Sequence, residues 1–258
     1  MKFTFSNLQV HSINRKTVYV FDEHQYALPL WAEFSISNSK QYGLVTFDFH
    51  TDTRQGFNRY ACLQNSGELH RVWDEFRINY VNSITPTDIK AVVEATKNLA
   101  NDEHICAALN FGYIDNAHVV NVENEHHDLN IFYYRIKTPF DLESIEITQN
   151  PYERDNGLTQ FFLNRIEDDY LVDTGFSIPP NPFILDFDLD YFPTRESLNP
   201  KNRKIITELI SKAQIITVAR EEFYFEKNRK QQGFDVREAE SLLLKLIEDV
   251  LLKRRAPL

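Results

Sequence analysis

Glycine, cysteine and long apolar runs are scarce in this sequence of 258 residues. With seven glycines and neither a P-loop nor a dinucleotide fingerprint, a glycine-rich phosphate loop is disfavoured. The two cysteines, Cys62 and Cys106, lie far apart, so we expect a reducing compartment and no disulfide scaffold. No apolar stretch is long enough to cross a bilayer, and the N-terminus lacks the apolar core of a signal peptide. We therefore expect a soluble, cytoplasmic protein with no membrane partner.

Basic residues are also in short supply. The chain has 28 Lys and Arg against 38 Asp and Glu, which gives a formal net charge of −10. Binding to nucleic-acid phosphates needs a surplus of basic side chains, so we expect no nucleic-acid partner. An acidic surface instead favours a cationic substrate.

What the sequence does contain suits one large folded unit. Hydrophobic residues make up 42% of the chain and aromatic residues 13%, enough for a sizeable core. Residue patterns predict strands at 17–21, 44–47, 119–122, 131–136, 183–190 and 214–219, and helices from 26, at 69–78, 85–99, 105–109, 158–166, 200–210 and 236–252. Strands that alternate with helices indicate an α/β fold of three layers, α/β/α, with a mostly parallel sheet in a single domain spanning 1–258. Residues 53–70 are polar, and we interpret them as a long loop.

Two of the predicted strands end in alternating acidic residues. The apolar run 44–47 leads into Asp48, His50 and Asp52, and the run beginning at 183 leads into Asp188 and Asp190. Alternate residues at a strand end project to the same side. Since a parallel sheet places its chemistry at the carboxyl ends of its strands, we expect the two stretches to form halves of one site.

A histidine at another strand end completes this set. His24 follows the strand predicted at 17–21; taken alone, it would be interpreted as an exposed loop residue. The candidate metal ligands are then His24, Asp48, His50, Asp52, Asp188 and Asp190. Four carboxylates in one place repel one another, and two divalent cations would balance their charge. A single Asp-x-His-x-Asp could be a solvated polar loop, but the second acidic strand end favours a metal site.

The ligand chemistry narrows the choice of metal. Oxygen-rich ligation with imidazole and without thiols suits manganese, with zinc, iron and cobalt as alternatives. Asp186 shares the strand parity of Asp188 but lies deeper, so we expect it to be a buried hydrogen-bond acceptor that supports the ligands.

These motifs resemble those of the arginase–agmatinase–deacetylase superfamily. The segment 48–52 matches its Asp-x-His-x-Asp motif, 187–190 is similar to its later Asp-x-Asp motif, and 22–24 resembles the element that ends in a metal-binding histidine. The resemblance covers most of the chain and implies an arginase-like fold with two Mn²⁺ ions. By the resemblance, the first ion is held by His24, Asp48, Asp52 and Asp188, and the second by Asp48, His50, Asp188 and Asp190, with Asp48 and Asp188 bridging.

The resemblance also implies catalytic and substrate-binding residues. The family's substrate-binding glutamate matches Glu221, with Glu222 as the neighbouring alternative. Residues 66–70 resemble the segment that carries the arginase proton-shuttle histidine, which corresponds to His70 here. Asp52 and His70 are therefore the candidates for delivering a proton to the leaving amine.

Departures from the family pattern narrow the expected substrate. The usual Gly-Gly-Asp-His is absent before His24, and Tyr191-Phe192-Pro193 replaces the aspartate-proline after the second motif. The loops that grip a free amino acid are not recognisable after Asp52. This divergent pattern looks closest to the peptide arginases, which convert arginine residues of a ribosomally made precursor peptide to ornithine and release urea. We expect loops 53–70 and 110–128 to recognise the peptide.

Three alternatives stay open on sequence alone. A deacetylase-like amidohydrolase would use one zinc ion on Asp48, His50 and Asp188. A ureohydrolase could act on free arginine or agmatine, and a non-enzymatic acidic module could bind a basic peptide. The oligomeric state, including a homo-oligomer, is also open.

Overall fold

A central sheet of seven strands organises the part of the chain that the computed structural model describes, namely residues 5, 7–66, 69–123, 130–136 and 166–253. The strands are β1 (Gln9–Ile13), β2 (Lys16–Phe21), β3 (Tyr42–Phe47), β4 (Ile114–Asn121), β5 (Ile131–Arg135), β6 (Phe183–Asp188) and β7 (Ile216–Ala219). Their order across the sheet is β1-β2-β7-β6-β3-β4-β5. All neighbours pair in parallel except β1 and β2, which form an antiparallel hairpin.

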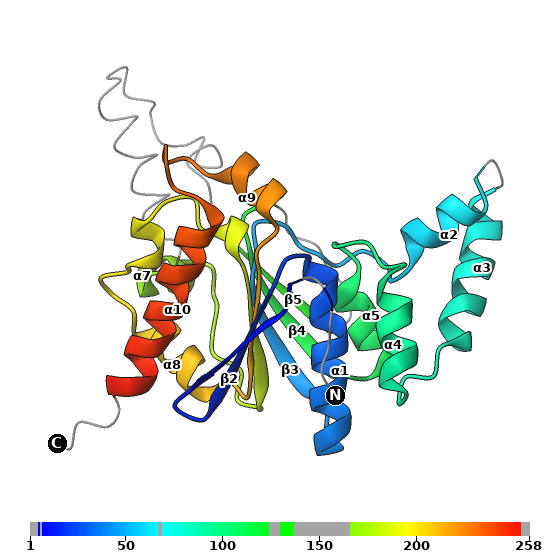
Figure 1. Cartoon of the computed structure of the whole chain (residues 1–258), viewed down its shortest axis with the longest axis horizontal. Coiled ribbons are helices and arrows are strands. Elements are labelled where there is room, and N and C mark those ends of the chain that lie inside the picture. Colours follow the sequence, from blue (N-terminus) through cyan, green and yellow to red (C-terminus); the bar gives the residue numbers. More distant parts are fainter. Residues whose placement is uncertain (1–4, 6, 67–68, 124–129, 137–165, 254–258) are drawn as a thin grey trace.

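Helices cover both faces of this sheet (Figure 1). One face carries α1 (Ala27–Asn38), α4 (Ile89–Thr96) and α5 (His104–Phe111). The other carries α7 (Asp168–Asp173), α8 (Lys204–Lys212) and α10 (Val236–Lys253), with α9 (Glu222–Asn228) near the carboxyl edge of the strands. The prediction of a three-layer α/β/α fold with a mostly parallel sheet is confirmed.

Side-chain alternation along the strands builds two cores, one on each face. Val45 and Phe47 of β3 face the layer of α8 and α10, whereas Leu44 faces α1 and α5. Strands β3 and β6 are buried at every position, as expected for central strands of a parallel sheet. Because Asp48 shares the parity of Leu44, it leaves β3 on the side of α1 and α5.

A helical arm departs from these layers. It consists of α2 (Asn58–Gln64) and α3 (His70–Ser83), which pack on each other through rings such as Tyr60 and Phe76 and project away from the sheet (Figure 1). Helix α3 has no buried residue among its fourteen. Among the described helices, none is both long and apolar enough to cross a membrane.

The arm corrects the prediction of a long loop at 53–70. Helix α2 forms there although its sequence offers no local cap, because a distant carboxylate, Glu103, accepts the Arg59 N–H at 2.7 Å. Strand β4 likewise occupies Ile114–Asn121 within 110–128, which we had expected to be a recognition loop. Strand β1 and helices α7 and α9 were not predicted. Most of the helix predicted at 158–166 lies outside the described residues.

Candidate metal centre

The carboxyl ends of β3 and β6 meet in the middle of the sheet. The chain passes from β3 to β4 on one side and from β6 to β7 on the other, so the two ends form a topological switch point, where open α/β sheets bind ligands. Phe47 pairs in register with Phe187. Asp48 and Asp188, the residues that follow them, therefore leave adjacent strands at the same level.

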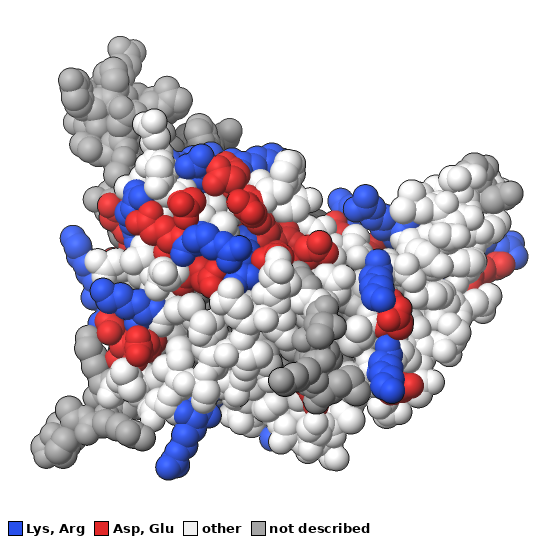
Figure 2. All heavy atoms as spheres, viewed as in Figure 1, with Lys and Arg blue, Asp and Glu red and all other residues white. Residues whose placement is uncertain are grey.

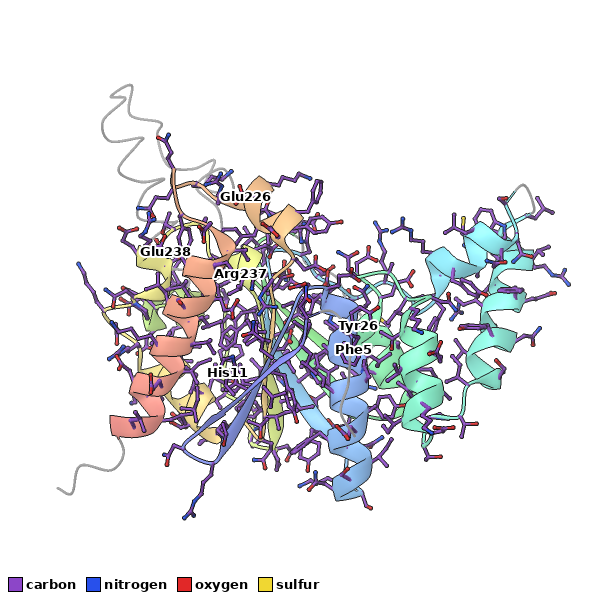
Figure 3. All side chains as sticks on the ribbon, in the orientation of Figure 1. Phe5, His11, Tyr26, Glu226, Arg237 and Glu238 are labelled. Carbon is purple, nitrogen blue, oxygen red and sulfur yellow. The ribbon has the colours of Figure 1, made fainter. Side chains whose placement is uncertain are left out.

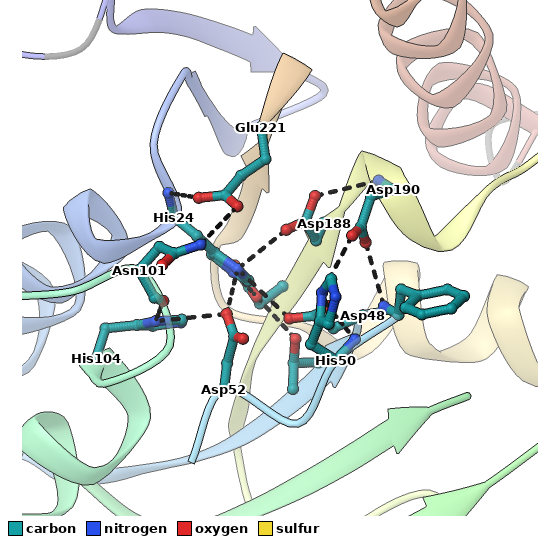
Figure 4. Close-up of polar contacts among 12 residues, drawn as sticks. His24, Asp48, His50, Asp52, Asn101, His104, Asp188, Asp190 and Glu221 are labelled. Carbon is teal, nitrogen blue, oxygen red and sulfur yellow. Dashed lines mark hydrogen bonds and ion pairs between the residues drawn. The ribbon is translucent and has the colours of Figure 1, made fainter. Parts of the chain in front are cut away.

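The first cluster of ligand atoms gathers around His24, in the turn after β2. Its Nδ1 lies 3.0 Å from Asp52 Oδ2, 3.3 Å from Asp188 Oδ2 and 3.5 Å from Asp48 Oδ2 (Figure 4). All four residues are buried. Within the described part of the chain, His24 Nδ1 and Asp48 Oδ2 have no hydrogen-bond partner. Three carboxylate oxygens thus converge on one ring nitrogen without satisfying it.

The second cluster shares Asp48 with the first. His50 Nδ1 lies 3.2 Å from Asp190 Oδ2 and 3.8 Å from Asp48 Oδ1. Asp48 therefore turns one oxygen toward His24 and the other toward His50, an arrangement suited to bridging two cations. Asp188 turns Oδ2 toward His24, while its Oδ1 accepts the Asp190 N–H at 3.1 Å, so a bridging role for Asp188 stays a prediction.

Asp186 sets the orientation of His24. Its Oδ2 lies 2.8 Å from His24 Nε2, and it accepts hydroxyl hydrogen bonds from Thr46 and Thr217, its in-register neighbours on β3 and β7. A carboxylate that binds Nε2–H leaves the lone pair on Nδ1, which faces the other three carboxylates. A histidine fixed in this way by a carboxylate is typical of metal sites.

Glu221 borders the clusters from the end of β7. Its Oε1 accepts the His24 N–H at 3.0 Å and its Oε2 accepts from Asn101 Nδ2 at 3.0 Å. Two residues of the site, Asp52 with φ 50° and Glu221 with φ 39°, have left-handed backbones. Side chains other than glycine rarely adopt this conformation, and it concentrates at functional sites.

A fully buried imidazole, His104, lies beside the first cluster. Its ring centroid is 4.2 Å from that of His24, and its Nδ1 is 2.8 Å from the Asn101 carbonyl oxygen and 3.8 Å from Asp52 Oδ2. Burial, followed by the nearby His24, lowers the pKa of His104 to about 4. This ring is therefore neutral at physiological pH.

Without cations the centre holds protons. Burial, followed by neighbouring carboxylates, raises the pKa of Asp48 and of Asp188 well above the usual range. Burial alone would lower the pKa of His24, but Asp186 and the other carboxylates outweigh it and raise that pKa well above its usual value. Burial likewise opposes protonation of His50, but Asp190 raises its pKa to about 9.

The residues present fit a pair of divalent cations. Two groups of residues each bring their potential ligand atoms within 4.8 Å of one another. The first is His24, Asp48 and Asp188, and the second is Asp48, His50 and Asp190. The donors are carboxylate oxygens and imidazole nitrogens, which suit Mn²⁺ and related ions. The unpartnered His24 Nδ1 and Asp48 Oδ2 point to a missing positive partner, since buried polar atoms are normally paired. A third set joins His24, His104 and Asp186, but there His24 and Asp186 already pair with each other.

Two of the predicted site residues lie elsewhere. His70 begins α3 on the projecting arm, where its exposed ring packs against Trp73 at 5.6 Å between centroids, so it is not brought to the clusters. Glu222 begins α9 and is exposed, whereas Glu221 is buried beside His24. Of these two glutamates, the geometry places Glu221 at the site.

Sequence reasoning missed His104 and Asn101. Both lie in or next to the connection from α4 to α5, without a strand-end motif to mark them. One signal was present: a histidine at the start of a short apolar helix that must pack on the sheet.

Comparisons with known proteins give little beyond this geometry. No family model and no curated protein sequence matches the chain. Among solved structures, the chain is similar to a hypothetical agmatinase from Burkholderia thailandensis, with 12% identity, a TM-score of 0.46 and coverage of 93% of this chain. The chain spans 60% of the length of that protein. A likeness of this degree says nothing about activity.

Proposed function

We propose that this chain is a metal-dependent hydrolase that acts on guanidinium groups. The observation that carries the proposal is the convergence of Asp48, Asp52 and Asp188 oxygens on the unpartnered Nδ1 of His24, with Asp48 shared with His50. Two divalent cations held by these residues would supply a water of lowered pKa. We propose manganese, held by the six residues His24, Asp48, His50, Asp52, Asp188 and Asp190.

The chain's own residues would bind and orient the substrate. A guanidinium is a planar cation, and a buried carboxylate such as Glu221 would bind it through charge-assisted hydrogen bonds. The water oxygen bonds to the guanidinium carbon, the bond from that carbon to the side-chain nitrogen breaks, and this nitrogen takes up a proton. Asp52 lies at the first cluster and is our candidate to carry that proton, since His70 is on the arm.

We further propose that the substrate is an arginine residue within a ribosomally made precursor peptide, giving ornithine and urea in the cytoplasm. This part rests on the resemblance to peptide arginases. It is supported by the absence of recognisable loops for gripping a free amino acid. Neither Cys62 nor Cys106 forms a disulfide in the described part of the chain, which agrees with a reducing compartment.

The test loads the purified protein with Mn²⁺ and offers arginine-containing peptides, free arginine and agmatine. Each converted arginine should lose the elements of cyanamide by mass spectrometry and release one urea. Asp48→Ala and Asp188→Ala should lose bound manganese and urea release together, whereas Asp169→Ala, at an exposed position on α7, should keep both. Undiminished urea release by metal-depleted Asp188→Ala would contradict the proposal. One zinc per chain with amide hydrolysis would favour the deacetylase alternative instead.

A further inference from the structure

The carboxylate of Glu221 is held by one donor on each oxygen. Oε1 accepts the backbone N–H of His24 and Oε2 accepts Nδ2 of Asn101, each at 3.0 Å (Figure 4). Two donors on different oxygens fix the plane of a carboxylate as well as its position. Each oxygen keeps a further acceptor site for a ligand.

Asn101 is itself held in place by its neighbours. Its backbone carbonyl oxygen lies 2.8 Å from His104 Nδ1. The next backbone carbonyl, that of Asp102, accepts the Arg54 N–H at 2.9 Å. On its other side, the Ala100 N–H donates to Glu103 Oε2 at 3.2 Å. The connection from α4 to α5 is thus anchored at three successive points around Asn101. Its amide group is presented to Glu221 from a rigid loop.

Glu221 gains this orientation from its partners because its own backbone gives little help. Its φ of 39° is unfavourable for a residue with a Cβ, so contacts elsewhere must hold it. The His24 N–H is a backbone donor and would survive any side-chain substitution at 24. The orientation of the Glu221 carboxylate plane therefore depends on the side chain at position 101.

We propose that Asn101 is a specificity-determining positioning residue that orients Glu221 for a planar guanidinium. This inference rests on the proposed function. A guanidinium donates two parallel N–H bonds in a rigid fork, so it gains from a carboxylate whose plane is fixed. The ammonium of a lysine is a compact point charge that binds a carboxylate in many orientations. Loss of the Asn101 amide therefore weakens guanidinium binding more than ammonium binding.

The test compares Asn101→Ala with Asn98→Ala in the manganese-loaded full chain. Asn98 lies three residues earlier and donates instead to the Tyr80 hydroxyl, so it is the matched control. In Asn101→Ala, KM for an arginine peptide should rise about tenfold to hundredfold, the range for losing a hydrogen bond to a charged group. The preference for an arginine peptide over the same peptide with lysine, measured by inhibition constants, should narrow. Bound manganese should stay at two per chain, and Asn98→Ala should match the wild type.

A second variant guards against loss of fold. Asn101→Asp has the same shape but, when ionised, has no N–H to donate to Glu221 Oε2, so it should narrow the preference for arginine over lysine as Asn101→Ala does. If Asn101 were merely structural, both variants would lower kcat through a smaller active fraction and leave KM and the arginine-to-lysine preference unchanged, which would overturn the inference. If the wild type released no urea from any arginine substrate, the proposed function would fall and this inference with it.

Discussion

The side chains around the candidate metal centre form a chain of hydrogen bonds. Asp186 bonds to the His24 ring and fixes its orientation. The His24 N–H and the Asn101 amide then each donate to one oxygen of Glu221. Such chains of contacts make the outcome of a substitution depend on which partner is left unsatisfied.

Replacing Asp186 tests the control of His24. In Asp186→Asn the side chain has a single acceptor oxygen for three donors, and its amide faces hydroxyl donors of Thr46 and Thr217. His24 would then lose its fixed tautomer, and we expect manganese affinity to fall about tenfold to hundredfold. Isothermal titration with Mn²⁺ measures this, with Asp169→Asn as the exposed control. An unchanged affinity would mean that Asp186 does not govern His24.

A histidine outside the site gives a prediction about pH. His118 of β4 stacks on Phe132 and Tyr134, and burial lowers its pKa to about 4. In the unfolded chain a histidine titrates near its usual pKa of about 6.5, so between these values the unfolded state binds more protons. The contribution of His118 to stability is therefore complete above about pH 6.5 and is lost as pH falls toward 4.

Urea denaturation at pH 7 and pH 5 checks this. The wild type should lose more free energy of unfolding between the two pH values than His118→Phe does. His70→Phe, which removes an exposed imidazole, should behave like the wild type. An equal loss in wild type and His118→Phe would contradict the prediction.

How far the sequence predicts the site also depends on individual residues. His24, Asp48, His50, Asp52, Asp188 and Asp190 are recognisable because each follows a strand of clear apolar pattern, and the structure brings them together. His104 and Asn101 could not be found in this way, because it is the packing of α5 against β4 and against the short 3-10 helix His24–Tyr26 that carries them to the site. His70 resembled a family motif, but the intervening arm carries it away.

At the scale of helices and strands, the apolar residue pattern predicted those elements whose own side chains are buried. Strands β3 and β6 and helix α10 have strong apolar patterns and were predicted. Helix α2 was missed because its first turn is satisfied by Glu103, 44 residues away. Strand β1 was missed because it is an edge strand with exposed residues such as Val10, and its register comes from the turn at Asn14 and Arg15, both with positive φ.

Helices α10 and α3 should respond differently to substitution. Leu243 of α10 is fully buried, so Leu243→Ala should lower the free energy of unfolding by about 2–5 kcal/mol. Ile78 of α3 is 44% exposed, so Ile78→Ser should change it by about 0.5 kcal/mol or less. Equilibrium urea denaturation of both variants measures the difference. A cost for Ile78→Ser as large as that for Leu243→Ala would show that the arm is packed more firmly than its exposure indicates.

At the scale of the whole molecule, acidic groups are unevenly spread. Figure 2 shows Lys and Arg interleaved with Asp and Glu over α9, α10 and the neighbouring loops, and Figure 3 shows Glu226, Arg237 and Glu238 among them. These surface acids have basic neighbours; Arg195, for example, pairs with Glu238. Among the described residues, the buried acids of the candidate metal centre have histidines rather than Lys or Arg as their ion-pair partners, so acidic groups with no permanent positive partner gather at the carboxyl edge of the sheet.

The stability of the whole chain should therefore depend on cations. Mn²⁺ at about a hundred times its dissociation constant should raise the free energy of unfolding by about 2.7 kcal/mol. Asp188→Asn should lose this gain, yet without metal it should melt no lower than the wild type, because one repelling acid has gone. Thermal melts with Mn²⁺ and with a chelator measure both effects. An equal manganese shift in Asp188→Asn would contradict the assignment of Asp188 as a ligand.

The pairing of β3 with β6 also dictates when this site can come into existence. Thr46 and Asp186 touch although 140 residues separate them, so a nascent chain that has emerged only as far as α5 carries four of the six candidate ligands and still lacks Asp188 and Asp190. Closure of so long a loop is slow relative to local helix formation. Cations that bind this candidate site would consequently do so only after β3 and β6 have paired, and they would stabilise a sheet that has already formed.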